Sequence, residues 1–234
     1  MSHILEAVDM NTFYGRSHIL FNVGLHVASG ETVCLMGRNG AGKTTTLRSL
    51  MGLTPPKTGR VVFKGEDCTG RAPYKMARMG LGFVPEDRRI LGPLTVWENL
   101  ELGRIRGRTG RWTMQTIMEQ FPVIAHFKDR LGGSLSGGEQ QILTIARALM
   151  GNPDVVLLDE PTEGLAPVIV TVLKELIMSL KSAETTILLS EQNIRFAMRV
   201  SDRVVVIDKG HVVYAGSMEE FRAEETVQKK YLAV

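Results

Sequence analysis

The stretch of residues 37–44, GRNGAGKT, restricts the possible folds more than any other part of this 234-residue chain. It follows a short apolar run at residues 32–36 and opens a helical pattern that continues through Leu47 and Leu50. A glycine-rich turn between a buried strand and a helix can wrap around a phosphate group, because its backbone N–H groups and the helix N-terminus point at one anion. The segment therefore predicts a phosphate-binding loop in an α/β protein.

Two side chains of this loop have defined roles in the prediction. Lys43 reaches the β- and γ-phosphates of a nucleotide, and the hydroxyl of Thr44 holds Mg²⁺. A glycine-rich turn that matches by chance is the alternative, and the strand before the loop and the helix after it argue against that alternative. The predicted nucleotide contacts are Gly37, Arg38, Asn39, Gly40, Ala41, Gly42, Lys43, Thr44 and Thr45.

A pair of carboxylates follows a second apolar run, in the segment VVLLDEP at residues 155–161. We expect Asp159 to complete the Mg²⁺ shell through water, and Glu160 to polarise the attacking water as general base. Taken alone, an apolar run that ends in Asp-Glu also fits a surface turn. In a chain with a phosphate-binding loop, the pair indicates hydrolysis of the bound nucleotide.

Short apolar runs alternate with longer helical patterns along the chain. Strands are expected at residues 4–10, 19–27, 32–36, 60–64, 155–158 and 186–189. The early strands are expected to be antiparallel, apart from the buried one before the loop. A helix at residues 168–181 separates the last two strands, which makes a parallel, right-handed unit. Helical spacing dominates residues 96–150, so we expect an α/β P-loop core with an antiparallel β subdomain and a helical subdomain inserted at about residues 87–150.

Composition narrows the classes of protein further. With 44% hydrophobic and 23% charged residues, the chain can bury one core of its own, so we expect a single domain. No apolar run approaches the roughly 18 residues of a membrane-spanning helix, and the first ten residues lack the layout of a secretory signal. We therefore expect the chain in the cytosol. A net charge of +3 is too small to imply nucleic-acid binding.

Two smaller features concern cysteine and arginine. Cys34 and Cys68 are far apart in sequence and lack metal-ligand spacing, so neither a disulfide nor redox chemistry is expected. One short segment without interleaved aromatic residues contains Arg104, Arg106, Arg108 and Arg111. We expect a solvated loop there, with contact to anionic lipid headgroups or to a partner protein as the alternative.

A third motif, LSGGEQQ, precedes the carboxylate strand and heads a helical pattern. Together with GRNGAGKT and VVLLDEP in this order, it resembles the ATP-binding-cassette (ABC) ATPases over essentially the whole chain. The resemblance implies one ABC ATP-binding domain over residues 1–234 that binds ATP and Mg²⁺ and hydrolyses ATP to ADP and phosphate. In this family, the cradle formed by Ser136, Gly137, Gly138 and Glu139 grips the γ-phosphate held by the opposite subunit. A chain with one cassette then pairs with a second, identical or related cassette.

Three further positions match landmarks of the family. Tyr14, in FYGRSHIL, matches the aromatic residue that stacks on adenine, with a half-buried strand tyrosine as the alternative. Glu86, in FVPE, lies where the family usually has Gln, in a loop that contacts both the metal and the membrane partner. Ala166, in EGLAP, lies where the family usually has Asp.

The last strand leads into SEQN, where the family normally has a histidine that touches the γ-phosphate. Gln192 occupies that position, and none of the five histidines is placed to replace it. We predict that Gln192 contacts the γ-phosphate as a neutral donor, since its amide N–H can donate but cannot become cationic. The alternative is that Gln192 only begins the turn before a helix at Ile194, with Asn193 as its cap.

The loops VPEDRR, EGLAP and LLSEQN together resemble one subgroup: the ATP-binding subunits of importers for branched-chain amino acids, and of related importers for urea and other amides. The resemblance implies two membrane-spanning permease subunits, which a periplasmic solute-binding protein supplies. It also implies a peripheral position at the cytoplasmic face of the inner membrane. We expect the inserted helical region to contact the permease through Glu86 and residues 88–91.

Two other classes of function are alternatives to a membrane transport subunit. ABC ATPases that act without a membrane, in translation and DNA repair, typically carry tandem cassettes or long coiled coils, and this sequence shows neither. A P-loop kinase or GTPase has no reason to contain LSGGEQ, and the sequence has no Asn-Lys-x-Asp motif for guanine. The membrane transport class is therefore preferred.

Overall fold

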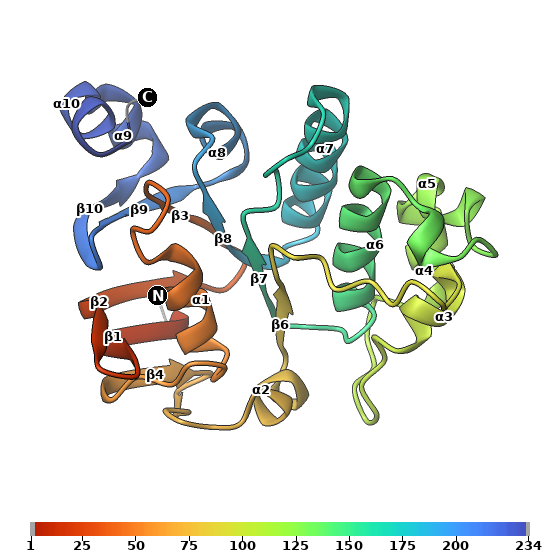
Figure 1. Ribbon diagram of the computed structural model, residues 1–234, viewed down its shortest axis with the longest axis horizontal. Coiled ribbons are helices and arrows are strands. Elements are labelled where there is room, and N and C mark those ends of the chain that lie inside the picture. The colour runs from red at the N-terminus through yellow and green to blue at the C-terminus, as the bar shows by residue number, and fades with distance from the viewer. Residues whose placement is uncertain (1–2, 233–234) are drawn as a thin grey trace.

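The computed structural model describes residues 3–232, and its strands form two sheets (Figure 1). The first sheet is antiparallel, has the order β2-β1-β4-β5, and consists of β1 His3–Tyr14, β2 Ser17–Ala28, β4 Thr58–Phe63 and β5 Glu66–Asp67. The predicted antiparallel strands are confirmed, although β1 and β2 extend over 12 residues each, beyond the expected ranges. Register shifts along the β1–β2 ladder mark bulges, which bend a strand while its pairing continues.

The second sheet has the order β10-β9-β3-β8-β7-β6. Its strands are β3 Thr32–Met36, β6 Leu81–Val84, β7 Val155–Asp159, β8 Thr186–Glu191, β9 Arg203–Asp208 and β10 His211–Ser217. Neighbours are parallel except β9 and β10, which form an antiparallel hairpin. Every residue of β3, β7 and β8 is buried, as expected for apolar strands covered on both faces. The predicted parallel unit around α7 Pro167–Ser182 is confirmed.

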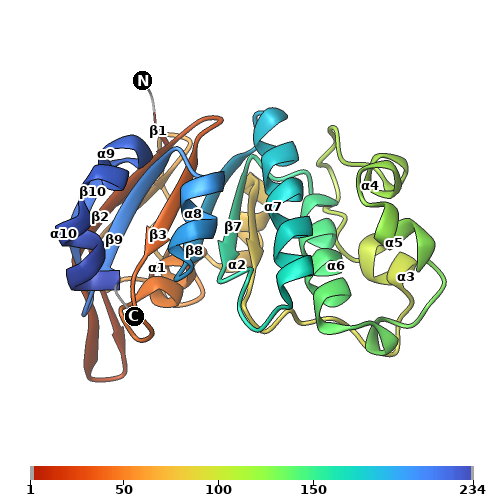
Figure 2. The same ribbon diagram turned by 90° about the horizontal axis from the view of Figure 1, so that it is seen from above.

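Side chains that alternate along the second sheet contribute to two separate cores. Val156 and Ile187 belong to the core with α6 (Gly137–Leu149), α7 and α8 (Ile194–Val200). Val155 and Leu188 belong to the core with α1 (Lys43–Leu50) and the first sheet. Figure 2 looks onto the layer of α8, α7 and α6. The remaining helices around the sheets are α1 Lys43–Leu50, α2 Pro73–Met79, α8 Ile194–Val200, α9 Met218–Ala223 and α10 Glu225–Val227, followed by a π-helical turn at Gln228–Leu232.

The region after β6 is mainly helical. It contains α3 Val96–Glu101, α4 Met114–Gln120, α5 Pro122–His126, a 3₁₀ turn at Gly132–Ser134 and α6 Gly137–Leu149. Helices α3, α4 and α5 lie at the end of the molecule opposite the antiparallel sheet (Figure 1). The expected helical spacing is wrong for residues 102–113, which form turns and irregular backbone. Three glycines lie in this segment, and Gly107 adopts φ 84°, outside the helical region. The limits of the inserted subdomain, about residues 87–150, stay a prediction.

The arginine-rich segment differs from the expected solvated loop at one position. The Arg108 side chain is only 18% exposed, and it pairs with Asp154 at 2.8 Å. Its guanidinium also donates to the carbonyl oxygens of Gly151 and Asn152. Arg108 therefore holds residues 102–113 against the loop before β7, because a fixed guanidinium fork can bond several acceptors at once. The other three arginines of this segment are exposed.

Two expectations about the whole chain can be compared with the described residues. Cys34 and Cys68 are both buried and both free. Over residues 3–232, no helix is long and apolar enough to cross a membrane.

Candidate functional site

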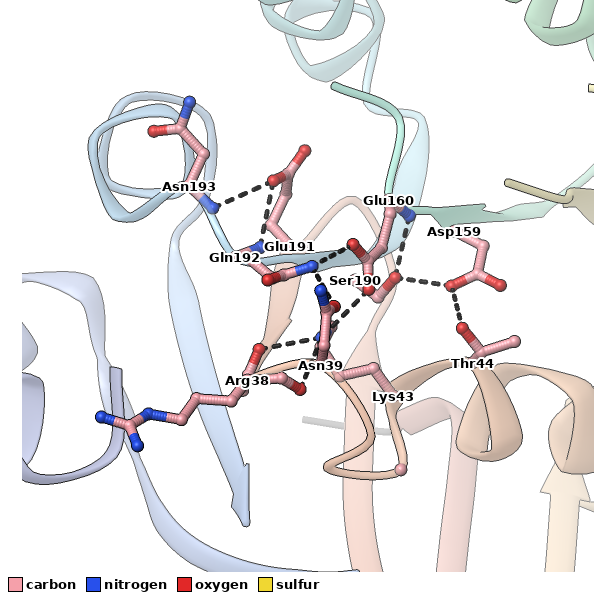
Figure 3. Close-up of polar contacts among 12 residues, drawn as sticks. Arg38, Asn39, Lys43, Thr44, Asp159, Glu160, Ser190, Glu191, Gln192 and Asn193 are labelled. Atoms are coloured by element: carbon pink, nitrogen blue, oxygen red, sulfur yellow. Dashed lines mark hydrogen bonds and ion pairs between the residues drawn. The ribbon is translucent and has the colours of Figure 1, made fainter. Parts of the chain in front are cut away.

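The carboxyl ends of three parallel strands meet at one edge of the second sheet. Strands β3, β8 and β7 are neighbours in that order, so the segments that follow them lie side by side. The phosphate-binding loop follows β3, Glu160 follows β7, and Gln192 follows β8. Figure 3 shows these side chains directed toward one another above the start of α1. The topology thus gathers residues that are far apart in the sequence.

The turn between β9 and β10 holds the phosphate-binding loop through backbone hydrogen bonds. Gly210 donates its N–H to the carbonyl oxygen of Ala41 at 2.8 Å and accepts from the N–H of Phe21 at 2.9 Å. It adopts φ 80°, and a Cβ at this position would lie 1.9 Å from the carbonyl oxygen of Ile19. Only glycine fits there, so the turn between β9 and β10 fixes the loop relative to β2.

Lys43 is the buried cation of the site. Its ammonium donates to the carbonyl oxygens of Gly37 at 2.8 Å and Arg38 at 3.0 Å, and it pairs with Glu160 Oε1 at 3.0 Å. The Lys43 and Glu160 side chains are 3% and 8% exposed, so the pair is shielded from water. A phosphate group bound in the loop competes with Glu160 for this ammonium.

Thr44 and Asp159 form the predicted metal-binding end of the site. The Thr44 hydroxyl donates to Asp159 Oδ1 at 3.1 Å, and the Ser190 hydroxyl donates to the same oxygen at 2.7 Å. Burial raises the pKa of Asp159, and the hydrogen bonds from Ser190 and Thr44 oppose that rise. The negative charges of Glu160 and Glu86 raise the pKa further.

The oxygen atoms at this end suit Mg²⁺ as part of a larger ligand set. Mg²⁺ prefers six oxygen ligands and usually keeps several waters, binding nucleotides through one or two protein groups plus the phosphates. Within residues 3–232 no group of three or more His, Cys, Asp or Glu side chains is placed to hold a metal. A hydroxyl and a carboxylate in contact fit Mg²⁺ that arrives with a triphosphate. They do not fit a metal held by the protein alone.

Gln192 contacts both the phosphate-binding loop and the segment that follows β7. Its amide Nε2 donates to Glu160 Oε2 at 2.5 Å and to Asn39 Oδ1 at 2.5 Å (Figure 3). Asn193 caps α8 instead, because its side chain accepts from the N–H of Phe196 at 3.1 Å. Gln192 thus points into the site, and the turn before α8 is made by its neighbour.

Glu160 has an unusual backbone and a shifted ionisation. Its φ of 44° is in the left-handed region, which costs a non-glycine residue about 1 kcal/mol or more. Burial alone would raise its pKa, but hydrogen bonds from Glu163, Gln192 and Lys43 outweigh that effect and lower it. The carboxylate is therefore ionised near neutral pH, as a general base requires.

The ionisation of Glu163 depends on its contact with Glu160. The hydrogen bond to the Glu160 carboxylate, followed by partial burial and repulsion from its charge, raises the pKa of Glu163 to about 7. Two carboxylates this close do not both ionise easily. Glu163 is protonated below about pH 7 and adds a negative charge to the site above it. Sequence reasoning did not assign this residue.

Some predicted residues lie outside this cluster. Ser136 and Glu139 form a capping box at the start of α6, where each side chain bonds to the backbone N–H of the other. A Cβ on Gly137 would meet the Arg88 guanidinium at 2.6 Å, and a Cβ on Gly138 would meet Ile169 at 2.7 Å. In Figure 1 the start of α6 lies apart from the start of α1. This motif does not contact the phosphate-binding loop of its own chain in any hydrogen bond between described residues.

The other two predicted contacts are exposed. Tyr14 ends β1 and is 45% exposed, opposite Ser17 across the β1–β2 turn. Leu20, on β2, lies beside Gly42, so this hairpin borders the phosphate-binding loop. Glu86 is exposed after β6, and its charge reaches the Asp159 end of the site. Their contacts with adenine and metal stay predictions.

Two further polar residues complete the cluster and were not assigned from the sequence. Ser190 accepts from the backbone N–H of Glu160 at 2.9 Å, and Glu191 accepts from both the N–H and the hydroxyl of Thr162. Both side chains are buried at the end of a strand that is otherwise apolar. Ser190 and Glu191 directly follow the apolar run 186–189. A polar side chain at the buried end of such a strand requires a hydrogen-bond partner, and this position was the signal in the sequence.

Comparison with known proteins decides the family. The family model described as ABC transporter matches residues 20–163. BraG from Pseudomonas aeruginosa, a high-affinity branched-chain amino acid transport ATP-binding protein, is 36% identical over 98% of this chain and 99% of its own length. The chain belongs to the ABC transporter family.

Two more comparisons extend this result to other ABC proteins. LptB from Haemophilus influenzae, a lipopolysaccharide export system ATP-binding protein, is 35% identical over 98% of this chain and 97% of its own length. A solved ATP-binding cassette, described as a dimeric post-hydrolysis state bound to ADP and Pi, is 27% identical with a TM-score of 0.80. That similarity covers 92% of this chain and 98% of the solved one. The P-loop cassette fold and the ATPase class are thereby confirmed.

The raised pKa of Glu163 predicts a pH dependence for this ABC ATPase. As pH rises through about 7, Glu163 ionises next to the site of the triphosphate, so kcat/KM for MgATP should fall by roughly two- to tenfold. Glu163→Gln keeps a neutral side chain at all pH values and should remove that fall. Steady-state ATPase assays from pH 6 to 8.5 measure both profiles, with the exposed Glu175→Gln as control. Identical profiles for the parent and Glu163→Gln would contradict the assignment.

The position of Gln192 predicts the effect of the histidine that is usual in the family. A neutral hydrogen bond contributes roughly 0.5–1.5 kcal/mol and a charged one about 1.5–3, so Gln192→His should raise the ATPase rate by roughly tenfold. Gln192→Ala should lower it. Rates in the reconstituted complex, at saturating ATP and several pH values, test this, because only histidine titrates near neutrality. Equal rates and pH profiles for all three chains would show that Gln192 makes no catalytic contact.

Proposed function

We propose that this ABC ATPase powers an importer for branched-chain amino acids. The observation that carries the ATPase chemistry is the buried contact of Glu160 with Lys43 at 3.0 Å, next to Asp159 and Gln192. The solute class is supported by the similarity to BraG over nearly the whole chain, and by the three loops that resemble the branched-chain subgroup. An importer for urea or other amides is the alternative within that subgroup.

Lipopolysaccharide export is a second candidate function. LptB of Haemophilus influenzae is 35% identical to this chain, against 36% for BraG, so overall similarity favours neither strongly. Both candidates use the same ATPase chemistry and differ in the permease that the cassette contacts. The segment LLSEQN favours the importer, because it resembles that subgroup at the position of Gln192.

The hydrolysis step follows from the positions of the side chains. When ATP binds, the Lys43 ammonium leaves Glu160, contacts the β- and γ-phosphates and compensates their charge. Thr44 and Asp159, with Glu86 nearby, would hold Mg²⁺, which would supply Lewis-acid stabilisation of the developing charge. Glu160, released from the ammonium, accepts a hydrogen bond from the attacking water and polarises it. Gln192 donates its amide to a γ-phosphate oxygen.

The motif at the start of α6 acts on a second cassette. The motif lies at the start of α6, apart from the start of α1 in the same chain (Figure 1), so it serves ATP only when another chain presents it. A helix N-terminus with small residues is a suitable cradle for a γ-phosphate. The dimeric solved cassette supports such pairing, with either an identical or a related subunit. ATP then holds two cassettes together, and hydrolysis separates them.

A groove between the helical region and the core is the proposed contact with the permease. It has a volume of about 400 Å³ and is lined mainly by apolar residues, among them Leu53 and Leu102. Arg89 and Arg147 also line it, and Arg147 forms no ion pair with any acidic side chain of residues 3–232. An apolar permease helix with an acidic residue complements such a groove.

This contact gives the cassette a peripheral position at the cytoplasmic face of the membrane. The groove is lined by Phe83 and Pro85, next to Glu86, so movement of the permease and rearrangement of the Asp159 end of the site are linked through one loop. A periplasmic solute-binding protein acts only indirectly, by delivering solute to the permease. The chain itself does not contact the solute.

The test of this function combines transport with loss of the general base. The chain is co-purified with its permease and reconstituted in vesicles, with MgATP on the side of the cassette and the solute-binding protein on the other side. Uptake of labelled leucine, urea and a lipid substrate is then measured. We expect leucine uptake. Glu160→Gln should lower ATP hydrolysis by roughly 10²–10⁴-fold and abolish uptake, while MgATP affinity stays within about threefold.

Glu175→Gln, an exposed substitution on α7, is the matched control and should behave as the parent does. Hydrolysis by Glu160→Gln at the parent rate would refute the role of Glu160. Movement of the amide substrate or the lipid in place of leucine would refute the branched-chain assignment and leave the ATPase assignment intact.

If the groove contacts the permease, a substitution in the groove should prevent assembly with the permease and leave ATP hydrolysis unchanged. Leu102 is 59% exposed and lines the groove, so Leu102→Glu should leave the fold and the ATPase rate of the paired cassettes within about twofold. It should prevent co-purification with the permease, because a carboxylate replaces apolar contact. Met178→Glu, 39% exposed on α7 outside the groove, is the control. Full assembly of the Leu102→Glu chain would contradict the proposed contact.

A further inference from the structure

Glu191 is a buried carboxylate that takes no part in the proposed hydrolysis step. It is the last residue of β8, is only 2% exposed, and pairs across the ladder with Met36 of β3. Its two oxygens accept four hydrogen bonds, two on each side. Burying a carboxylate costs free energy unless its oxygens accept hydrogen bonds. A buried carboxylate with all its hydrogen bonds formed therefore fixes the groups that donate to it.

One oxygen of Glu191 holds the segment that follows Glu160. Oε1 accepts from the Thr162 hydroxyl at 2.7 Å and from the Thr162 N–H at 3.2 Å. The other oxygen holds the segment that contains Gln192, because Oε2 accepts from the N–H groups of Gln192 and Asn193 at 3.2 Å each. A single side chain therefore joins the segments after β7 and β8.

The joined segments carry the two groups that meet in the site. Glu160 lies two residues before Thr162 and has the strained φ of 44°. Its N–H is fixed by Ser190 at 2.9 Å, and Glu191 fixes the chain on the other side, at Thr162. A strained backbone conformation persists only when its surroundings define it from several sides. Glu191 thus helps to define the direction of the Glu160 side chain.

We propose that Glu191 is a positioning residue, which sets the Glu160 carboxylate and the Gln192 amide at hydrogen-bonding distance by joining their two loops. The inference rests on the ATPase activity and on the proposed role of Glu160, and it is independent of the permease and the solute. Three successive residues of one strand end, Ser190, Glu191 and Gln192, then grip the Glu160 segment through its backbone, its following turn and its side chain.

The chemistry of the neighbours explains why this position has a carboxylate. All four partners are donors, namely three backbone N–H groups and one hydroxyl, and an ionised carboxylate only accepts. Glu191→Gln has nearly the same shape but turns an NH₂ group toward two donors, which leaves buried donors unpaired. Glu191→Asp keeps the charge but is shorter by one methylene, so it can serve the local N–H groups and loses Thr162.

The test is a double-mutant cycle between Glu191 and Thr162, read as ATPase kinetics of the chain paired with its second cassette. Glu191→Gln should lower kcat by roughly tenfold or more and leave the Kd for MgATP within about twofold, because the phosphate-binding loop is untouched. Thr162→Val should lower kcat in the same manner but less, and Thr162→Ser, which keeps the hydroxyl, should restore it. The double variant should be no slower than Glu191→Gln alone, since both changes break one contact.

Glu191→Asp decides between bridging and a merely local turn. If Glu191 bridges, Glu191→Asp resembles Thr162→Val in kcat; if it serves only the turn before α8, Glu191→Asp keeps the parent rate and the inference is wrong. Additive losses in the cycle, or a loss of MgATP affinity equal to the loss of kcat, would also overturn it. Melting temperatures verify folding, and if Glu191→Gln does not fold, the comparison of Thr162→Val with Thr162→Ser and Glu191→Asp carries the same decision.

These measurements need neither permease nor solute, so a wrong transport assignment leaves them unaffected. A wrong assignment of Glu160 as general base is recognised separately, because Glu160→Gln would then hydrolyse ATP at the parent rate. In that case the coupling between Glu191 and Thr162 would have no effect on kcat.

Discussion

The ion pair between Lys43 and Glu160 is the interaction around which the site is arranged. A buried ammonium is costly unless it is paired and hydrogen-bonded, and Lys43 finds its partners at the end of β3 and after β7. To supply one of them, Glu160 takes a left-handed backbone conformation that its neighbours must maintain. The same pairing makes Lys43 exchangeable, since the charge of a phosphate attracts the ammonium that Glu160 holds.

The parallel order of β3, β8 and β7 makes this pairing possible. Strand β8 lies between the other two, so its end faces the phosphate-binding loop on one side and the Asp159 segment on the other. Ser190 and Gln192 use this position to contact Asp159, Glu160 and Asn39. In the proposed mechanism, a change at the γ-phosphate therefore affects both Glu160 and the segment that leads into α8.

Much of this arrangement was predictable because local signals and strand order agree. The glycine-rich loop and the Asp159–Glu160 pair each follow an apolar strand, and the parallel unit brings their ends together. The partners of Ser190, Glu191 and Thr162 were not predictable, because they depend on the register between β7 and β8. The burial of Arg108 was missed for a similar reason: its acceptors lie on a loop more than 40 residues later in the chain.

A crystal structure of the chain with Mg²⁺ and a non-hydrolysable ATP analogue tests the central claim most directly. The account predicts the triphosphate in the loop of residues 37–44, with Lys43 Nζ and Gln192 Nε2 each within about 3.2 Å of γ-phosphate oxygens and the Glu160 carboxylate free to face a water molecule. An unbroken contact of Lys43 with Glu160, with the analogue bound elsewhere, would contradict it.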